Sequence, residues 1–323
     1  MKQIVSHLKN SRSVLLATHV NPDGDAIGSL IAMGLALEAL GKKATLYCAS
    51  PIPAVYRFLP ATDTITGVFA NETLFDTAIV LDCGNLNRVG KAFLEIQKIK
   101  TIINIDHHVT NTGFGDLQMV DTAACATAEI IYRLIKKLGI SISPGMATSI
   151  YTGIFTDTGS FRFSNTNRAA FSICEEMVAI GMDPYTVAQN VYGTYSLGRI
   201  KLLNLALDSI EVAAGGKVSI MTLTKKMLAE TKTHPEDVDG LINYAKRIED
   251  VKLAALLQEM ENISRKPDEA ARFHVSLRSD GSVDVAEIAA TFGGGGHAVA
   301  AGFNIDSPIE EIKAKIVSLA EKL

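Results

Sequence analysis

Compact apolar runs alternate with longer helical patterns over the first part of the chain. The apolar runs are short enough for strands and lie at residues 14–18, 44–48, 78–81 and 102–105. Apolar residues at helical spacing lie at residues 26–40, 124–138, 147–155 and 169–180. Continuously apolar strands that alternate with helices are typical of a parallel sheet covered on both faces. We therefore predict an α/β domain with helices on both faces of a parallel sheet.

The pattern changes after about residue 190. An amphipathic stretch at 199–210 predicts a connecting helix, and two β-rich segments flank Gly215-Gly216, which is a hairpin signal. Further strands are expected at 253–258, 272–277 and 300–305, before a closing helix. These elements predict a smaller α+β domain with a mixed or antiparallel sheet. The expected limits are 1–190 for the first domain, 191–212 for the connecting helix and 213–323 for the second domain.

Composition and charge narrow the classes of protein. An apolar fraction of 47% in 323 residues is ample for two cores. The net charge is -4, and the chain has no long basic run. This disfavours binding of long nucleic acid and favours a small or short phosphorylated substrate. No stretch approaches the roughly 20 apolar residues of a membrane span. Four cysteines without CxxC pairing indicate buried thiols in a reducing compartment, so we expect a cytoplasmic protein.

A histidine and two aspartates follow the first predicted strand. His19 is followed by Asp23 and Asp25, in a turn that contains Pro22 and Gly24. Asp25 stands where a helix N-cap is expected, and capping would explain it alone. Capping explains neither His19 nor Asp23. Three metal-capable side chains within seven residues therefore favour a functional site.

Three later segments deliver similar side chains. Asp82 follows the third strand, Asp106-His107-His108 follows the fourth, and Asp157 ends an apolar helix. Each residue taken alone could be a helix cap or a hydrogen-bonded carboxylate at a strand end. The carboxyl ends of parallel strands meet at one edge of a sheet, however, so we expect these side chains to converge there. Carboxylates gathered there would repel unless cations neutralise them. Imidazole with carboxylate suits Mn, Fe, Co or Zn, and an oxygen-rich set without cysteine favours Mn²⁺.

These motifs resemble those of the DHH phosphoesterase superfamily. The resemblance rests on His19-x-x-Pro22-Asp23-x-Asp25-Ala26, Asp82, Asp106-His107-His108 and Asp157, in that order. Near the end, the run Phe292-Gly293-Gly294-Gly295-Gly296-His297 resembles the glycine-rich motif of the DHHA1 domain. Together the motifs cover essentially the whole chain. The layout is similar to that of the NrnA-type enzymes, which are nanoRNases that also dephosphorylate 3′-phosphoadenosine 5′-phosphate.

The resemblance implies two divalent metal ions that share Asp82. One ion would be held by His19, Asp23 and Asp82, and the other by Asp25, Asp82, His107 and Asp157.

The resemblance also implies different roles for the two adjacent histidines. His107 would be a ligand, and His108 would face the substrate and stabilise or protonate the leaving oxygen. Because they are neighbours in an extended segment, we expect their side chains to diverge. Asp106 suits an acceptor for an imidazole N–H better than a ligand.

Candidate substrate residues lie mainly in the second domain. The glycine run alone would be a flexible turn, but followed by His297 it suggests a backbone nest in which Gly294, Gly295 and Gly296 approach a phosphate. Alternation along 273–278 places His274, Ser276 and Arg278 on one face of a strand, and Arg278 resembles the family's substrate-phosphate arginine. Arg162, shortly after Asp157, fits a substrate contact and an ordinary surface residue equally well.

The family resemblance predicts hydrolysis of short single-stranded oligonucleotides or dinucleotides, and of small phosphorylated nucleotides, by a homodimer. A cyclic-dinucleotide phosphodiesterase is the nearest alternative. An inorganic pyrophosphatase is less well supported. The second domain of that family has a basic phosphate-binding cluster in place of the glycine motif found in this chain. A catalytically dead nucleotide-binding regulator conflicts with the complete set of ligand motifs.

Overall fold

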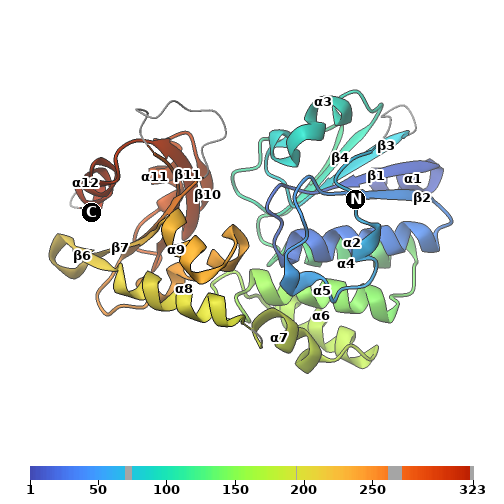
Figure 1. The fold of residues 1–323 in the computed structure, drawn as a ribbon. Coiled ribbons are helices and arrows are strands. Elements are labelled where there is room, and N and C mark those ends of the chain that lie inside the picture. The colour runs from blue at the N-terminus through green and yellow to red at the C-terminus, as the bar shows by residue number, and fades with distance from the viewer. Residues whose placement is uncertain (70–74, 194, 261–270, 321–323) are drawn as a thin grey trace. The chain divides into compact units, whose positions relative to one another are not determined.

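The computed structural model describes residues 1–69, 75–193, 195–260 and 271–320. The chain divides into two compact units, Met1–Thr194 and Tyr195–Leu323, and each has its own sheet (Figure 1). The predicted functional limits of 1–190, 191–212 and 213–323 remain a prediction. None of the helices in the described ranges has the length and hydropathy of a membrane span.

The first unit contains a five-stranded parallel sheet with the order β2-β1-β3-β4-β5. The strands are β1 (Ser13–Ala17), β2 (Lys43–Tyr47), β3 (Thr77–Leu81), β4 (Ile102–Asp106) and β5 (Leu117–Val120). Every residue of the central strand β3 is buried, as expected for a strand covered on both faces. Strand β5 was not predicted, because its four residues at the sheet edge are only half-buried or exposed.

Helices cover both faces of this sheet, as predicted. The larger core lies between a layer of helices and the face of the sheet that presents Leu16, Ile79 and Ile103. That layer comprises α1 (Lys2–Asn10), α2 (Gly24–Ala39), α4 (Thr127–Leu138), α5 (Pro144–Asp157), α6 (Arg168–Ala179) and α7 (Pro184–Tyr192). A smaller core on the Leu15 and Val80 face is covered by the short elements η4 (Leu86–Ala92) and α3 (Phe93–Ile96). Two further 3₁₀ turns are η1 (Ala54–Tyr56) and η2 (Thr62–Thr64).

The strand order creates a switch point between β1 and β3. From β1 the chain moves outward to β2, and it then returns to place β3 on the other side of β1. In open α/β sheets, ligands bind at such a point, beyond the carboxyl ends of the strands. The loops that follow β1 and β3 begin there.

The second unit contains a mixed six-stranded sheet with the order β10-β11-β9-β8-β7-β6. Its strands are β6 (Glu211–Ala213), β7 (Val218–Leu223), β8 (Leu253–Glu259), β9 (Arg272–Ser279), β10 (Gly295–His297) and β11 (Ala300–Asp306). Strands β7 and β8 are parallel, and the other neighbours are antiparallel. The predicted hairpin is present as β6 and β7, with Gly215 and Gly216 at positive φ between them.

Helices cover this second sheet on both faces. They are α8 (Leu197–Asp208), α9 (Lys225–Thr231), α10 (Ile242–Lys246), α11 (Val285–Ala290) and α12 (Ile309–Ala320), with the 3₁₀ turns η5 (Ala214–Gly216) and η6 (Pro235–Val238). Along β9, Phe273, Val275 and Leu277 are buried in the core that includes residues of α11 and α12. On the other face of β9, His274, Ser276 and Arg278 are half-buried, as the alternation predicts.

Candidate metal centre

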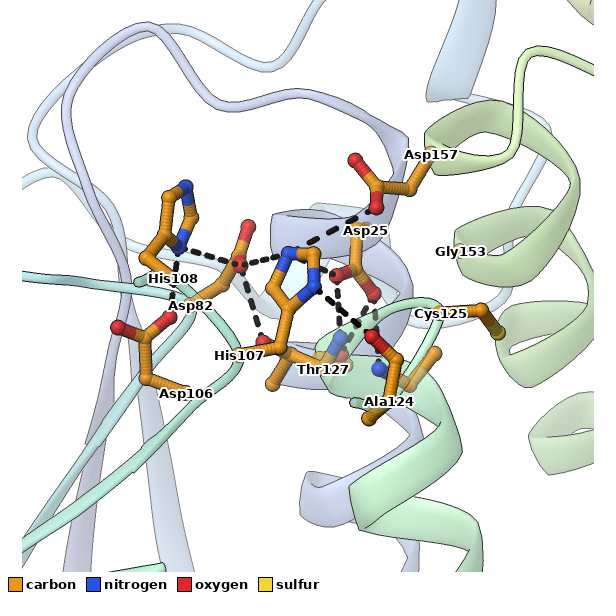
Figure 2. Close-up of polar contacts among 12 residues, drawn as sticks. Asp25, Asp82, Asp106, His107, His108, Ala124, Cys125, Thr127, Gly153 and Asp157 are labelled. Atoms are coloured by element: carbon orange, nitrogen blue, oxygen red, sulfur yellow. Dashed lines mark hydrogen bonds and ion pairs between the residues drawn. The ribbon is translucent and has the colours of Figure 1, made fainter. Parts of the chain in front are cut away.

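The predicted ligands gather at the carboxyl edge of the parallel sheet, and Figure 2 shows Asp25, Asp82, His107 and Asp157 among them. His19 follows β1, Asp82 follows β3 and His107 follows β4. Asp25 lies in the first turn of α2, and Asp157 is the last residue of α5. Residues more than a hundred positions apart in the chain therefore reach one place because three strands and two helices end there.

Asp82 occupies the centre of this group. Its Oδ2 lies 3.5 Å from Nε2 of His19, and its Oδ1 lies 3.7 Å from Nε2 of His107. These separations are long for direct hydrogen bonds. They suit ligand atoms around a shared ion, since bonds of about 2.0–2.2 Å place neighbouring ligands about 3–4 Å apart. The two oxygens of one buried carboxylate thus face two different sets of donors.

Two overlapping sets of donors match the predicted ligands. His19, Asp23 and Asp82 make one, and Asp25, Asp82 and His107 make the other, with the ligand atoms of each set within 4.8 Å of one another. Oδ2 of Asp157 lies 3.6 Å from Nε2 of His107, beside the second set. All six residues predicted to bind metal are therefore close together. Their assignment as metal ligands remains a prediction.

The two histidines in these sets are held in the orientation that metal-binding histidines adopt. Nδ1 of His19 lies 2.8 Å from the carbonyl of Val20, and Nδ1 of His107 lies 3.4 Å from the carbonyl of Ala124. A carbonyl only accepts, so the short contact of His19 places a ring proton on Nδ1 and directs Nε2 toward the site, and the longer contact of His107 favours the same orientation. Metal-ligating histidines usually make this second contact. The donor set therefore fits a divalent cation.

The electrostatics of the site also fit a cation. Burial raises the pKa of Asp25 well above its usual range, and the charges of Asp82 and Asp157 add to the rise. The pKa of Asp157 is raised by burial and by the charges of Asp23 and Asp82. Burial opposes ionisation of Asp82 too, but its contact with His19 and the charge of His108 lower the pKa of that carboxyl below its usual range. A bound cation would relieve the repulsion among these carboxylates.

His108 lies beside the two donor sets, and its hydrogen-bond partner is Asp106. Its Nδ1 donates to Oδ1 of Asp106 at 2.7 Å and lies 3.7 Å from Oδ1 of Asp82. Burial opposes the charged ring, but the Asp106 hydrogen bond and the two carboxylate charges raise the pKa of His108 to about 9. Asp106 thus accepts from an imidazole, which is the contact predicted for it. Asn111, which was not predicted, donates to Oδ2 of Asp106 at 2.6 Å.

Two local predictions about this group are wrong. The N-cap of α2 is Asp23, whose Oδ1 accepts the backbone N–H groups of Asp25 and Ala26, because the helix begins at Gly24. His107 and His108 do not point to opposite sides. Their ring centroids are 4.9 Å apart, and both rings approach Oδ1 of Asp82. They lie beyond the end of β4, where the alternation of strand backbone no longer applies.

Thr127 and Asn165 belong to the site and were not predicted. Thr127 donates its hydroxyl to Oδ1 of Asp82 at 2.9 Å, and its backbone N–H to Oδ2 of Asp25 at 2.6 Å. Nδ2 of Asn165 donates to Oδ2 of Asp157 at 3.1 Å. The apolar pattern placed the start of this helix at residue 124, three residues before α4 begins at Thr127. If the start of the helix had been predicted at residue 127, Thr127 would have been identified as a polar residue in its first turn.

The predicted substrate residues lie in both units. In the first, Arg162 is exposed and its Nε donates to the carbonyl of Gly159. In the second, Nη1 of Arg278 donates to the carbonyl of Leu277 at 2.9 Å. The glycine run is not a flexible turn throughout, because Gly295–His297 forms β10 and pairs with β11. Substrate contacts of Gly294, Gly295, Gly296, His297, Arg278 and Arg162 remain predictions.

The glycines permit β10 because they allow two backbones to approach closely. A Cβ on Gly294 would lie 2.2 Å from the carbonyl oxygen of Gly302, and one on Gly296 would lie 2.5 Å from that of Ala300. The four cysteines are buried and form no disulfide, as the absence of paired motifs suggested.

Comparison with known proteins identifies the family. The model of the DHH family, N-terminal domain, matches residues 13–154, and that of the DHHA1 domain matches residues 215–323. A bifunctional oligoribonuclease and PAP phosphatase, NrnA, of Thermus thermophilus is 34% identical over 289 residues, which cover 90% of this chain and 83% of that protein. The chain belongs to the DHH/DHHA1 phosphoesterase family. Its enzyme class is therefore that of a metal-dependent phosphoesterase, a hydrolase.

Solved structures share the fold of this DHH/DHHA1 phosphoesterase. An exopolyphosphatase-related protein from Bacteroides fragilis has a TM-score of 0.89 and 27% identity, covering 100% of this chain and 96% of that one. RecJ from Thermus thermophilus, in complex with Mn²⁺, has a TM-score of 0.60 and 14% identity, covering 100% of this chain and 55% of that one. The second likeness is one of fold alone. The buried cluster of acidic and histidine side chains is consistent with a divalent metal in this family member.

Proposed function

We propose that this phosphoesterase is an exonuclease of the nanoRNase type. Its substrates are short single-stranded oligonucleotides and linear dinucleotides, and it also removes a phosphate from 3′-phosphoadenosine 5′-phosphate. The observation that carries the proposal is the central Asp82, whose two oxygens face separate sets of histidine and aspartate donors. The name of the Thermus thermophilus relative, which is similar over 90% of this chain, supports these substrates.

The proposed ligands divide into two sets that share Asp82. His19 and Asp23 complete one set, and Asp25, His107 and Asp157 complete the other. When bound, two divalent ions lower the pKa of the attacking water and neutralise charge on the phosphoryl oxygens. We propose Mn²⁺ as the ion, because the set is rich in oxygen and contains no cysteine.

The remaining residues handle the leaving group and the substrate. Asp106 holds the Nδ1 proton of His108, and this hydrogen bond favours the protonated ring. The ring can then stabilise the leaving oxygen or transfer a proton to it from Nε2. We assign phosphate binding to Arg278 and to the glycine run with His297, because a guanidinium and an imidazole suit a phosphate and glycine lets a phosphate approach the backbone closely.

Three broader features belong to the same proposal. Residues 1–190 supply the metal site, and residues 213–323 bind the substrate. The enzyme acts in the cytoplasm. It acts as a homodimer, as the family resemblance implies.

Side-by-side turnover with Mn²⁺ tests this function. The substrates are the linear dinucleotide pApA, 3′-phosphoadenosine 5′-phosphate, a cyclic dinucleotide and pyrophosphate. We expect hydrolysis of the first two. Preference for the cyclic compound or for pyrophosphate would instead support one of those alternative enzymes, and turnover of none would support the regulator. Product analysis on labelled RNA and DNA of two to five nucleotides then shows whether residues are removed from an end.

Asp82→Ala tests the catalytic centre itself. Loss of the shared carboxylate should reduce Mn²⁺-stimulated hydrolysis to the level of metal-free protein, because both donor sets lose a member. The far-ultraviolet circular dichroism spectrum should remain that of the parent. Full activity of this variant would reject the central role of Asp82.

A further inference from the structure

Thr127 contacts two of the carboxylates in the candidate metal centre (Figure 2). Its Oγ1 donates to Oδ1 of Asp82 at 2.9 Å. Its backbone N–H donates to Oδ2 of Asp25 at 2.6 Å. The side chain is fully buried, so water does not compete for either contact. Asp82 and Asp25 are two carboxylates of the second donor set.

The backbone of Thr127 is fixed by an unusual helix cap. Helix α4 follows Ala126, whose side chain makes no capping hydrogen bond. The carboxylate of Asp25, from α2, instead accepts the N–H groups of Thr127 and Ala128 at 2.6 and 2.8 Å. The free N–H groups and partial positive charge of a helix N-terminus favour this arrangement. The start of α4 is thereby tied to a proposed metal ligand.

The hydroxyl of Thr127 selects one oxygen of Asp82. The backbone of Asp82 is held by its N–H, which donates to the carbonyl of Ile105 at 3.0 Å. Its carboxylate could still rotate about the Cβ–Cγ bond, and rotation would change which oxygen faces which donor set. Thr127 binds Oδ1, the oxygen nearest His107, and leaves Oδ2 toward His19.

We propose that Thr127 is a positioning residue that orients the Asp82 carboxylate between the two metal sites. This inference rests on the proposed metal-binding function of Asp82. The hydroxyl contributes a fixed orientation rather than a ligand. Partners that orient ligands in this way typically change metal affinity or activity by about 10–100-fold when they are removed.

The experiment compares Thr127→Val with Thr127→Ser in the full chain. Valine keeps the shape and the backbone N–H but removes the hydroxyl, whereas serine keeps the hydroxyl. Thr152→Val is the matched control, because Thr152 is equally buried but donates to the carbonyl of Thr148 within its own helix. Each chelator-treated protein is titrated with Mn²⁺ by calorimetry. Its unfolding midpoint is measured without metal, and its hydrolysis rate is measured against Mn²⁺ concentration.

We expect Thr127→Val to weaken Mn²⁺ binding by about 10–100-fold and to raise the Mn²⁺ concentration needed for half-maximal rate. Thr127→Ser should restore both, and Thr152→Val should match the parent. Should Thr127→Val fail to fold, Thr127→Ala replaces it, since alanine also removes only side-chain atoms.

The outcomes separate this inference from the proposed function. Parent-like Mn²⁺ binding in the hydroxyl-free variant, with binding lost in Asp82→Ala, would overturn the role of Thr127 alone. A lowered midpoint without metal and unchanged Mn²⁺ binding would also overturn it, because the hydroxyl would then act only in folding. Parent-like binding in Asp82→Ala would overturn the proposed metal site itself.

Discussion

The turn residues beside the site have strained backbones. Asp82 and Asn21 both have a φ of 54°, in the left-handed region that non-glycine residues rarely adopt. This conformation costs most L-residues about 1–2 kcal/mol, and it costs less for the short polar side chains of Asp and Asn. In each turn a backbone hydrogen bond helps to hold the chain, from Asp82 N–H to Ile105 and from Val20 N–H to Arg88. Strain of this kind is common where a side chain must be directed into a site.

Asp121 lies outside the metal centre but contacts Arg133 of α4, the helix that carries Thr127. Its Oδ2 accepts from Arg133 at 2.7 Å, and its Oδ1 accepts from the backbone N–H of Ala123 at 3.1 Å. The hydrogen bond from Arg133 is the chief reason why the pKa of this carboxyl is lowered. The contact links the segment after β5 to α4, the helix that carries Thr127.

Asp121→Asn should therefore lower stability in a pH-dependent way. A pKa that is lower in the folded state stabilises the fold above the unfolded value, about 3.9, and this stabilisation is lost as the pH falls through the folded value. We expect a loss of about 1 kcal/mol or less at neutral pH, because both side chains are about one-third exposed. The difference from the parent should shrink below about pH 4.

Urea unfolding of both proteins, with chelator, from pH 7 down to pH 3 checks this prediction. Arg133→Gln removes the same contact together with the ion pair to Glu129, so the double variant should lose no more stability than Arg133→Gln alone. A difference between parent and Asp121→Asn that stays constant with pH would contradict it.

Close packing of three helices positions the acidic residues at their ends. A Cβ on Gly28 of α2 would lie 2.3 Å from the carbonyl oxygen of Ser149 on α5. A Cβ on Gly153 of α5 would lie 2.6 Å from that of Ala128 on α4 and 2.9 Å from Oδ1 of Asp25. Glycine at these two positions lets α2, α4 and α5 approach each other closely. Their ends can then bring Asp25, Thr127 and Asp157 to one edge of the sheet.

The edge strand β10 depends on one glycine more than on its neighbour. Gly296 has a φ of 148°, and a Cβ there would lie 2.5 Å from the carbonyl oxygen of Ala300. A Cβ on Gly295 would meet nothing within 4 Å. Gly296→Ala should therefore cost about 1–3 kcal/mol through backbone strain and overlap, and Gly295→Ala should leave stability nearly unchanged.

Urea unfolding and amide hydrogen exchange of the β10–β11 segment check this contrast. Equal stability of the two variants would contradict it. Because both glycines are also predicted to contact the substrate, the activity of the stable Gly295→Ala variant tests that separate prediction. A large rise in KM with unchanged stability would support a contact with the phosphate.

At the scale of the whole molecule, the hydrophobic cores follow the division into two units. The two cores of the first unit contain residues no later than Val191, and the two cores of the second contain none before Leu202. Each unit therefore buries its own apolar surface, which is the main source of folding free energy. All six proposed metal ligands belong to the first unit.

A fragment of residues 1–194 should consequently fold and bind metal but lose hydrolysis of dinucleotides. Mn²⁺ at about 100 times its dissociation constant should stabilise the fragment by about 2.7 kcal/mol, since the folded state alone holds the site. Thermal unfolding with and without Mn²⁺ measures this, and the same fragment with Asp82→Ala should show no shift. Dinucleotide hydrolysis by the fragment would contradict the substrate-binding role of residues 213–323.

Local patterns in the sequence determined the strands β1 to β4, the main helices and the polar residues at their ends. Apolar periodicity and turn-forming residues act between chain neighbours, so they are visible without a structure. The family motifs added a set of residues that the fold brings together around Asp82. The short strands β5 and β10 carry no such pattern, because each is defined by the partner beside it.

Only the tertiary structure decided how the side chains of the site pair. Thr127 and Asp82 are 45 residues apart, and Asp25 caps a helix that begins more than a hundred residues later. The orientation of His108 toward Asp82 likewise follows from where β4 ends. Such contacts depend on the packing of whole helices against a sheet, and a pattern that repeats every two or four residues contains no information about distances across the fold.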